Sequence, residues 1–263
     1  MKYTKIDPPG TFCNYEALRD LIKQINPKTF VDVGCEGGIS KLLCSMGMIG
    51  VGIDFSQLAI EATRKNLEKE IGAGAYSLIE ADATSLNCKT LSADMALSFM
   101  AMEHVEDDVA FVRILSGLVR QGGHLAICVP GRRDCWSFED ETVGDLRRYD
   151  RDDLANVLRA GGLTDVEVWS VAVPTGNLLL HLSDWVVRRS GEAKKVTLSQ
   201  REQTETSGLR EIPWKTAFPS WFKLILKRYT LYPLYPIQRL FYRTGLGITM
   251  LGFGRVPDPI VTT

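Results

Sequence analysis

The sequence lacks the features that mark secreted, disulfide-bonded or zinc-binding proteins. Its six cysteines include no CxxC pair, so we expect reduced thiols in a cytoplasmic protein, with no disulfide framework and no metal site. The opening stretch MKYTKIDPPGTF has no apolar segment of the kind found in signal peptides. No uninterrupted apolar run reaches the roughly 18 residues that a spanning helix needs. We therefore expect neither a secretory signal nor a transmembrane helix.

The chain also has a small net charge and few histidines. The 263 residues carry a formal net charge of −1, which gives no overall attraction to nucleic acids, and none is expected as a partner. Only His104, His124 and His181 could act as neutral imidazole bases near neutral pH. With 45% hydrophobic residues, a chain of this length can bury one large core, and we expect one domain with an insertion.

What the sequence does contain is a regular alternation of strand-like and helix-like segments. An amphipathic helix is predicted over Asn14 to Ile25, because Leu18, Leu21 and Ile22 recur at helical spacing. Several β-rich runs are apolar on both faces, which is typical of a parallel sheet covered by right-handed crossovers. The predicted fold class is therefore α/β, a doubly wound, seven-stranded, mostly parallel sheet. Its strands are expected in TFVDV, GVGID, AYSLIEAD, DMALSF, HLAICVP, DVEVWSVAV and GITMLGFGRV.

The helices between these runs have recognisable start and stop signals. They are expected over Ser40–Met46, Gln57–Glu70, Val109–Val119 and Arg151–Ala160. Asp108 is predicted to cap the helix that carries Phe111, Leu115 and Leu118, and Gly122-Gly123 to turn the chain into the next strand.

A change of composition near Pro174 predicts three parts: a core over 1–173, a helical insertion over 174–246 that forms a cap, and a final strand and tail over 247–263. Within the insertion, NLLLHLSDWVVRR is expected to be helical. The segment from Trp214 to Thr263 contains seven Lys or Arg but one acidic residue, Asp258. Aromatic residues are interleaved with these basic residues. This mixture fits an ordinary cap with its own core, a membrane-interface or apolar-tunnel segment, or a dimer surface. The interleaved aromatics are Trp214, Trp221, Tyr229, Tyr232, Tyr235 and Tyr242.

A glycine cluster follows the first strand, in VDVGCEGGISKLL. Gly34 and Gly38 remove side chains where a backbone must approach a ligand, and Asp54 ends the second strand. A carboxylate at that position can accept hydrogen bonds from two ribose hydroxyls. A dinucleotide fingerprint would place further glycines where Glu36 and Ile39 stand, which argues against a nicotinamide-dependent oxidoreductase.

Five ordered features make the sequence resemble the class I S-adenosylmethionine-dependent methyltransferases, in the subgroup of small-molecule and lipid methylating enzymes. They are VDVGCEGG, GIDFS, EADATSL, DMALSFMAMEHVEDD and GGHLAICVP, between about Phe30 and Val173. The resemblance implies a Rossmann-like core that binds S-adenosylmethionine. In it, the Gly34–Gly38 backbone contacts the methionine part, Asp54 the ribose, Asp82 with Ala83 the adenine, and Phe99 with Met100 the sulfonium end. The full cofactor set implied is Asp32, Gly34, Cys35, Gly38, Asp54, Phe55, Asp82, Ala83, Phe99 and Met100.

Alternatives to this assignment remain open at three places. Gly34 and Gly38 could simply allow tight packing of a strand against a helix, and Asp54 and Asp82 could be turn residues. Glu36 could face the ammonium group of the cofactor, weaken its binding, or lie in solvent.

His104 is the candidate catalytic base, because it follows the fourth strand beside the expected methyl position. Its neutral imidazole could take a proton from a hydroxyl or a stabilised carbon. Alternatively, it orients the start of a helix by hydrogen bonds. His124, at a strand start, is expected to pack or to face solvent.

The segment GRRDCWSFEDETVGDLRRYDRDDL is expected to bind the acceptor. Trp136, Arg147, Arg148 and Tyr149 together suit an anionic head group beside an aromatic wall. Alternatively, the two arginines pair with acids of the same segment, namely Glu139, Asp140, Glu141 or Asp145.

These observations predict a methyl transfer from S-adenosylmethionine to a hydrophobic or amphiphilic small molecule, such as an isoprenoid, quinone-like ring, lipid or glycolipid. The alternatives are O- or N-methylation of a soluble natural product or sugar, and a fold without catalysis that binds a membrane or a partner. Peripheral association with the inner face of the membrane is expected only if the cap contacts lipid.

Overall fold

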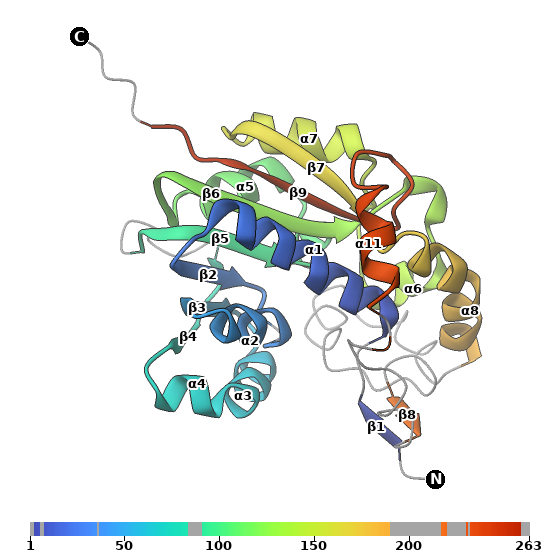
Figure 1. Cartoon of the computed structure of the whole chain (residues 1–263), viewed down its shortest axis with the longest axis horizontal. Helices are drawn as coiled ribbons and strands as arrows, with labels where there is room; N and C mark the ends of the chain where they lie inside the picture. Colours follow the sequence, from blue (N-terminus) through green and yellow to red (C-terminus); the bar gives the residue numbers. More distant parts are fainter. Residues whose placement is uncertain are drawn as a thin grey trace. The chain divides into compact units, whose positions relative to one another are not determined.

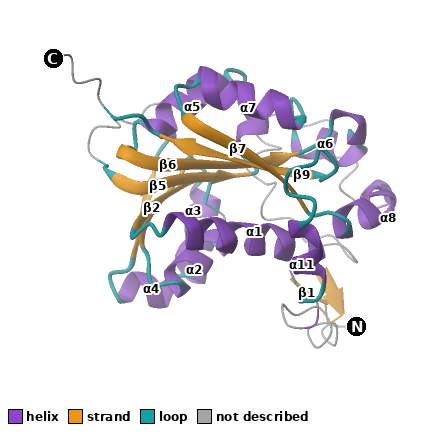
Figure 2. Cartoon of the chain, turned by 45° about the horizontal axis from the view of Figure 1, so that its top comes forward, coloured by secondary structure: helices purple, strands orange, loops and turns teal. Residues whose placement is uncertain are grey.

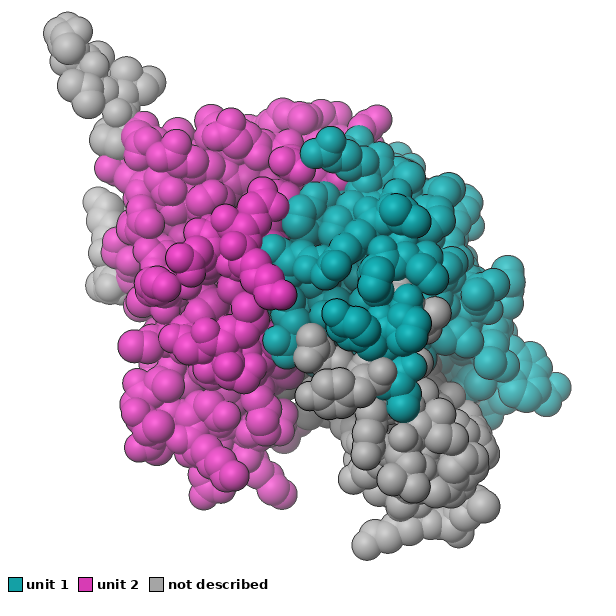
Figure 3. Space-filling model, in the orientation of Figure 1, with its two compact units in different colours: residues 1–20, 130–151, 169–250 teal, residues 21–129, 152–168, 251–263 magenta. Residues whose placement is uncertain are grey.

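The computed structural model of the chain describes residues 3–5, 8–35, 37–83, 91–189, 217–219, 230 and 232–258. Two compact units can be distinguished, and Figure 3 colours them separately. Unit 1 comprises residues 1–20, 130–151 and 169–250; unit 2 comprises residues 21–129, 152–168 and 251–263. The predicted boundaries at 173 and 246 differ from this grouping, in which residues 1–20 and 130–151 cluster with 169–250.

A seven-stranded sheet has most of its residues in unit 2 (Figure 2). The strand order is β4-β3-β2-β5-β6-β9-β7, and the pairs β2–β3, β3–β4, β2–β5 and β5–β6 are parallel. The doubly wound, mostly parallel sheet predicted from the sequence is confirmed. Its strands are β2 (Thr29–Val33), β3 (Ile49–Asp54), β4 (Tyr76–Glu80), β5 (Ala93–Phe99), β6 (Val119–Pro130), β7 (Thr164–Val171) and β9 (Thr249–Arg255).

Helices cover both faces of this sheet in unit 2, with α5 and α7 on one face and α2 and α3 on the other (Figure 2). Burial of strand side chains explains why both faces must be covered: from Met95 to Ser98 and from Leu125 to Val129, no side chain of β5 or β6 is exposed by more than 1%. The helices are α1 (Pro9–Ile25), which begins in unit 1, α2 (Gly38–Ser45), α3 (Gln57–Asn66), α4 (Glu68–Gly72), α5 (Asp108–Ser116) and α7 (Arg151–Ala160).

Three local predictions were wrong. The helix predicted over Gln57–Glu70 is two helices, because the fully buried Leu67 leaves helical geometry between α3 and α4. Asp107, not Asp108, caps α5: its carboxylate accepts a hydrogen bond from the backbone N–H of Ala110 at 2.8 Å. Gly122, with φ +71°, lies inside β6 and not before it, where the pairing with β5 is irregular.

Unit 1 contains a short antiparallel pair, β1 (Tyr3–Lys5) with β8 (Ala217–Pro219), and, besides most of α1, three described α-helices (Figure 1). These helices are α6 (Phe138–Val143), α8 (Thr175–Arg189) and α11 (Leu234–Arg239). The helix predicted in NLLLHLSDWVVRR is confirmed as α8. The predicted cap residues Trp214, Trp221 and Tyr229 lie outside the described residues, as do Glu36 and Cys88.

A polar cluster ties the ends of unit 1 together. Asp20 accepts hydrogen bonds from Arg239 Nε and Nη2, both at 2.7 Å, and from the Tyr242 hydroxyl at 2.9 Å. The Tyr242 ring stacks on Trp169 with 4.5 Å between ring centroids. These contacts explain why residues 1–20, which precede the sheet in sequence, cluster with the C-terminal half of the chain.

Within the part of the chain that the structure describes, no helix combines the length and the apolar character needed to cross a bilayer. Five of the six cysteines lie there, and all five are free thiols.

Candidate cofactor site and catalytic residues

The carboxyl ends of the five parallel strands β2 to β6 form one edge of the sheet. Backbone bonds join these ends: Gly34 N–H donates to Ile53 O at 2.9 Å, Ala81 N–H to Asp54 O at 2.9 Å, and Met100 N–H to Cys128 O at 2.8 Å. Ligands of open α/β sheets bind at this edge. The structure therefore brings the predicted glycine loop, Asp54, Asp82, Phe99 and Met100 to the same edge.

The loop after β2 approaches its surroundings too closely for side chains. Gly34 has φ +78°, and a Cβ atom there would lie 3.0 Å from Ala101 Cβ. Gly37 has φ +83° and is the N-cap of α2, yet no side chain caps this helix end. The first N–H groups of α2 can therefore take a carboxylate, such as that of a methionine group. Gly37 was missed by the sequence analysis, which named only its neighbour Gly38, the first residue of α2.

A buried polar chain holds the strand and the helix on either side of this loop. Ser40 Oγ lies 2.6 Å from Asp32 Oδ2 and 2.8 Å from the Tyr76 hydroxyl oxygen. Since a hydroxyl has one proton, Ser40 donates to the carboxylate and accepts from Tyr76. All three side chains are at most 3% exposed. Asp32 therefore supports the loop through Ser40 and Tyr76, which were not predicted from the sequence.

Cys35 adds a second support for the loop. Its carbonyl oxygen accepts a hydrogen bond from Thr63 Oγ1 at 2.9 Å. Burial, with the nearby charges of Asp32 and Asp54, raises the pKa of the Cys35 thiol far above its usual range. Burial likewise raises the pKa of the Tyr76 hydroxyl. Both groups are therefore neutral at physiological pH, and Cys35 is a packed thiol without nucleophilic character.

Replacing Ser40 by alanine tests this support. The change removes a hydrogen bond to a buried carboxylate and one from a buried phenol, so we expect a loss of about 2 kcal/mol in the free energy of unfolding, measured by urea denaturation. Ser45→Ala is the matched control on the same helix, because the exposed Ser45 hydroxyl bonds only the Leu42 carbonyl. We expect that control to change stability by less than about 0.5 kcal/mol. Equal effects of the two changes would contradict a structural role for the chain of hydrogen bonds.

Asp54 is the last residue of β3, and its carboxylate can accept hydrogen bonds from a ligand. Its side chain is 9% exposed, and its Oδ1 accepts a hydrogen bond from Ser56 N–H at 2.8 Å. Burial raises the pKa of the carboxyl to about 6, although backbone hydrogen bonds from Ser56 and Phe55 oppose the rise. An ionised carboxylate accepts about four hydrogen bonds, so two ribose hydroxyls fit here. Phe55, 38% exposed, follows at the same strand end.

Cofactor affinity should therefore depend on pH through Asp54. Above pH 6 the carboxylate is ionised and accepts both hydroxyls, whereas below pH 6 protonation removes acceptor capacity. We expect the affinity for S-adenosylhomocysteine, measured by calorimetry between pH 7 and pH 5, to fall toward a tenfold loss per unit below about pH 6. Asp54→Asn should bind more weakly at pH 7 and show no such slope. A wild-type affinity that does not change across this window would contradict the ribose assignment.

The remaining predicted cofactor residues lie on the same edge. Asp82 is exposed and Ala83 is buried at the end of β4, where the described chain stops until residue 91. Phe99 and Met100 are half-buried at the end of β5. Met100 has φ +52°, a left-handed conformation that non-glycine residues adopt at a cost and that often marks functional sites. This conformation redirects the chain out of the strand.

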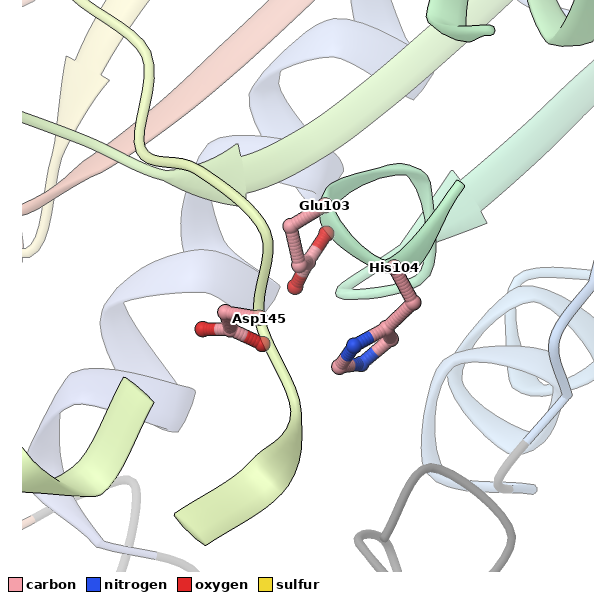
Figure 4. Close-up of side chains that lie close together, drawn as sticks. All are labelled: Glu103, His104 and Asp145. Atoms are coloured by element: carbon pink, nitrogen blue, oxygen red, sulfur yellow. The ribbon is translucent and has the colours of Figure 1, made fainter. Parts of the chain in front are cut away.

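His104 lies in the short turn that follows, the 3-10 helix Met102–His104 (Figure 4). Its backbone N–H donates to Ala101 O at 3.2 Å, and its imidazole is half-buried. Glu103 projects from the same turn and is 2% exposed. The structure therefore places His104 in unit 2, one short turn beyond the strand end that carries Met100.

His124 lies further from the carboxyl edge of the sheet than His104 does. In the register of β5 with β6 it pairs with Met95, four residues before Phe99, which is about 13 Å from the carboxyl edge. Burial lowers the pKa of its imidazole, and the nearby charges of Arg255 and Arg120 lower it further. His124 was predicted to pack or to face solvent, and its side chain is half-buried.

Unit 1 contains most of the segment predicted to bind the acceptor. The Arg148 guanidinium, 8% exposed, donates from Nε to Asp140 Oδ1 at 2.8 Å and from Nη2 to Asp140 Oδ2 at 3.0 Å. Its Nη1 donates to Gly131 O at 3.1 Å. Asp140 also accepts from the N–H and hydroxyl of Ser137, which forms a capping box at α6. Arg148 therefore pairs within its own segment, as the alternative interpretation expected.

The other predicted acceptor residues differ in exposure. Trp136 is 42% exposed and Arg147 is partly exposed, whereas Tyr149 is 2% exposed. Tyr149 N–H donates to Pro130 O, and its carbonyl accepts from Arg132 N–H, both at 3.0 Å. Asp145, labelled in Figure 4, follows α6 with its N–H donating to Asp140 O at 2.9 Å. A role of Trp136 and Arg147 in acceptor binding stays a prediction.

Residues 31–127 match the family model described as Methyltransferase domain. They therefore correspond to a methyltransferase domain. The matched range begins within β2 and ends within β6, so it contains the glycine loop, Asp54, Asp82 and His104. The close packing at Gly34, the uncapped end of α2 and the acceptor capacity of Asp54 all fit S-adenosylmethionine.

Curated relatives share parts of this methyltransferase domain. A ubiquinone biosynthesis O-methyltransferase from Cupriavidus pinatubonensis is 33% identical over 115 residues, which cover 43% of this chain and 45% of the relative. A probable S-adenosylmethionine-dependent methyltransferase from Mycobacterium tuberculosis is 22% identical over 149 residues, or 56% of this chain and 52% of the relative. The chain thus spans about half the length of the curated relatives it matches.

Solved structures show the same fold over nearly the whole chain. A phosphoethanolamine N-methyltransferase from Haemonchus contortus aligns with 93% of this chain and 52% of its own, at 16% identity and a TM-score of 0.56. The cyclase SpnF aligns with 92% of this chain and 82% of its own, at 16% identity and a TM-score of 0.57. At this identity the likeness shows the fold alone, and a reaction must be argued from the site.

Proposed function

We propose that the chain transfers a methyl group from S-adenosylmethionine to a hydroxyl of a small amphiphilic acceptor with a quinone-like ring. The observation that carries the proposal is the edge of the sheet in unit 2, where the Gly34 loop, the uncapped α2 end and the buried Asp54 carboxylate lie together. The name of the C. pinatubonensis relative, a ubiquinone biosynthesis O-methyltransferase, supports the acceptor class.

The chain's own residues act mainly by positioning. S-adenosylmethionine supplies a methyl group that is already electrophilic, so holding the acceptor in line and excluding water accounts for most of the rate. The α2 N-terminus binds the carboxylate of the methionine part. Asp54 accepts the ribose hydroxyls, and Phe99 with Met100 lies at the end of the site where the methyl group is expected.

His104 acts as the general base in this proposal. When a hydroxyl attacks the methyl carbon, its proton must leave, and a neutral imidazole can accept it. The partly exposed imidazole on the turn after β5 can reach solvent to release the proton afterwards.

A methyl-transfer assay tests the acceptor class. The protein is incubated with S-adenosylmethionine carrying an isotopically labelled methyl group and either a catechol with an isoprenoid tail or the same catechol without it. We expect label in the extractable tailed product and a preference for it of about tenfold or more, since each buried CH₂ group contributes about 0.8 kcal/mol. Faster labelling of the tailless catechol, or of a sugar, would instead support a soluble acceptor.

A further inference from the structure

One face of α8 in unit 1 exposes apolar side chains to solvent. Leu178, Leu182 and Trp185 keep 78%, 56% and 51% of their surface exposed. Their spacing of four and three residues places them on one stripe of the helix, and Arg189, four residues further on, continues it. A surface helix normally turns such an apolar stripe toward the core. We call these four residues the α8 stripe.

Contacts with α6 hold the opposite side of α8. Asp184 Oδ1 accepts a hydrogen bond from Phe138 N–H at 3.0 Å, and the Arg188 guanidinium lies 4.9 Å from the centroid of the Phe138 ring. Val187 is fully buried. Turning the α8 stripe inward would break these contacts, so the apolar exposure is built into unit 1.

The α8 stripe ends in positive charge. The Arg189 guanidinium lies 4.3 Å from the centroid of the Trp185 ring, which is cation–π contact. Arg188, by contrast, is paired with Asp184 at 2.7 Å and lies off the stripe. No acidic side chain belongs to the stripe, so its net charge is positive. Leucine, tryptophan and arginine in this order are typical of helices that lie in the interface between lipid and water.

We propose that the α8 stripe docks on an anionic lipid surface. From Leu178 to Arg189 the helix rises about 16 Å at 1.5 Å per residue, which suits a helix lying in the interface plane. A second copy of the chain fits less well, because pairing stripe to stripe would bury two Arg189 charges with no acidic partner on either stripe. The docking stands on α8 alone and does not depend on the proposed methyl transfer.

Co-sedimentation of the full chain with lipid vesicles tests the proposal. The vesicles are phosphatidylcholine with or without phosphatidylglycerol, at low salt. We expect binding to the anionic vesicles, and a loss of about tenfold or more in partition for the double variant Leu178→Ser, Leu182→Ser. Arg189→Gln should lower the preference for anionic over neutral vesicles about fivefold, since one such charge contributes about 1 kcal/mol.

Ile49→Ser is the matched control, because Ile49 in unit 2 is 57% exposed, as much as Leu182. It should leave partition unchanged, and circular dichroism should show that every variant folds. Absence of wild-type binding at low salt would overturn the proposal, as would equal losses for Ile49→Ser and the double variant. A wild-type dimer that the double variant converts to a monomer without lipid, measured by sedimentation velocity, would overturn it in favour of a second copy.

Discussion

Gly34→Val is expected to lower the affinity for S-adenosylhomocysteine by at least about a hundredfold, because a misplacement of about 1 Å in a binding loop can cost that much. Valine is strained at φ +78°, and its Cβ would lie 3.0 Å from Ala101 Cβ, so the loop must move. Calorimetric titration of the folded variant gives the affinity. Gly34→Ala, with a smaller side chain but the same Cβ contact, should show a smaller loss in the same direction.

The control variant Gly74→Val tests whether the effect of Gly34→Val comes from backbone strain alone or from the place of Gly34 in the cofactor site. Gly74 has φ +72°, but nothing lies within 4 Å of the place where its Cβ would be. This control carries nearly the same strain in a turn before β4, so we expect a lower melting temperature and an unchanged affinity. Should Gly34→Val bind within about threefold of the wild type, the glycine loop would not be the methionine site.

His104→Ala is expected to reduce turnover at least about a hundredfold, which is the lower range for the loss of a general base. Cofactor affinity should stay near that of the wild type, because the imidazole acts on the acceptor's proton. Methyl transfer to the tailed catechol gives the turnover, and calorimetry with S-adenosylhomocysteine gives the affinity.

His124→Ala serves as the control histidine, because His124 is also partly buried but lies on β6 beside Met95, away from the carboxyl edge. We expect its turnover to remain within about threefold of the wild type. Unchanged turnover in His104→Ala would remove His104 from the mechanism. A loss of cofactor affinity would instead support the alternative, in which His104 orients the turn.

The sheet could be predicted because its strands carry strong local signals. TFVDV matches β2 residue for residue, and the helix predicted at Arg151–Ala160 is α7. The errors arose where neighbouring residues offer the same chemistry. Asp107 and Asp108 can both cap a helix, and only the direction of the backbone decides between them. The break at Leu67 lies at a fully buried side chain within a helical pattern that continues on both sides, so the pattern alone did not predict it.

The residues of the candidate site that end or follow strands were predicted from the sequence. The buried side chains that hold the glycine loop, Ser40 and Tyr76, were not. Gly34 and Asp54 follow strands that are visible in the sequence, so their shared edge follows from parallel pairing. The contact of Ser40 with Tyr76 joins residues 36 positions apart, and a single sequence has no signal for such a pair. The bond between Arg148 and Asp140 was one of two alternatives, and only the geometry of the segment after β6 selects it.

The most direct test of the account is a calorimetric titration of the folded wild-type chain with S-adenosylmethionine, S-adenosylhomocysteine and a nicotinamide dinucleotide. We expect saturable heat at one site for the first two ligands and none for the dinucleotide, with Asp54→Asn weakening both affinities. No heat from either adenosyl ligand would contradict it, and so would saturable binding of the dinucleotide.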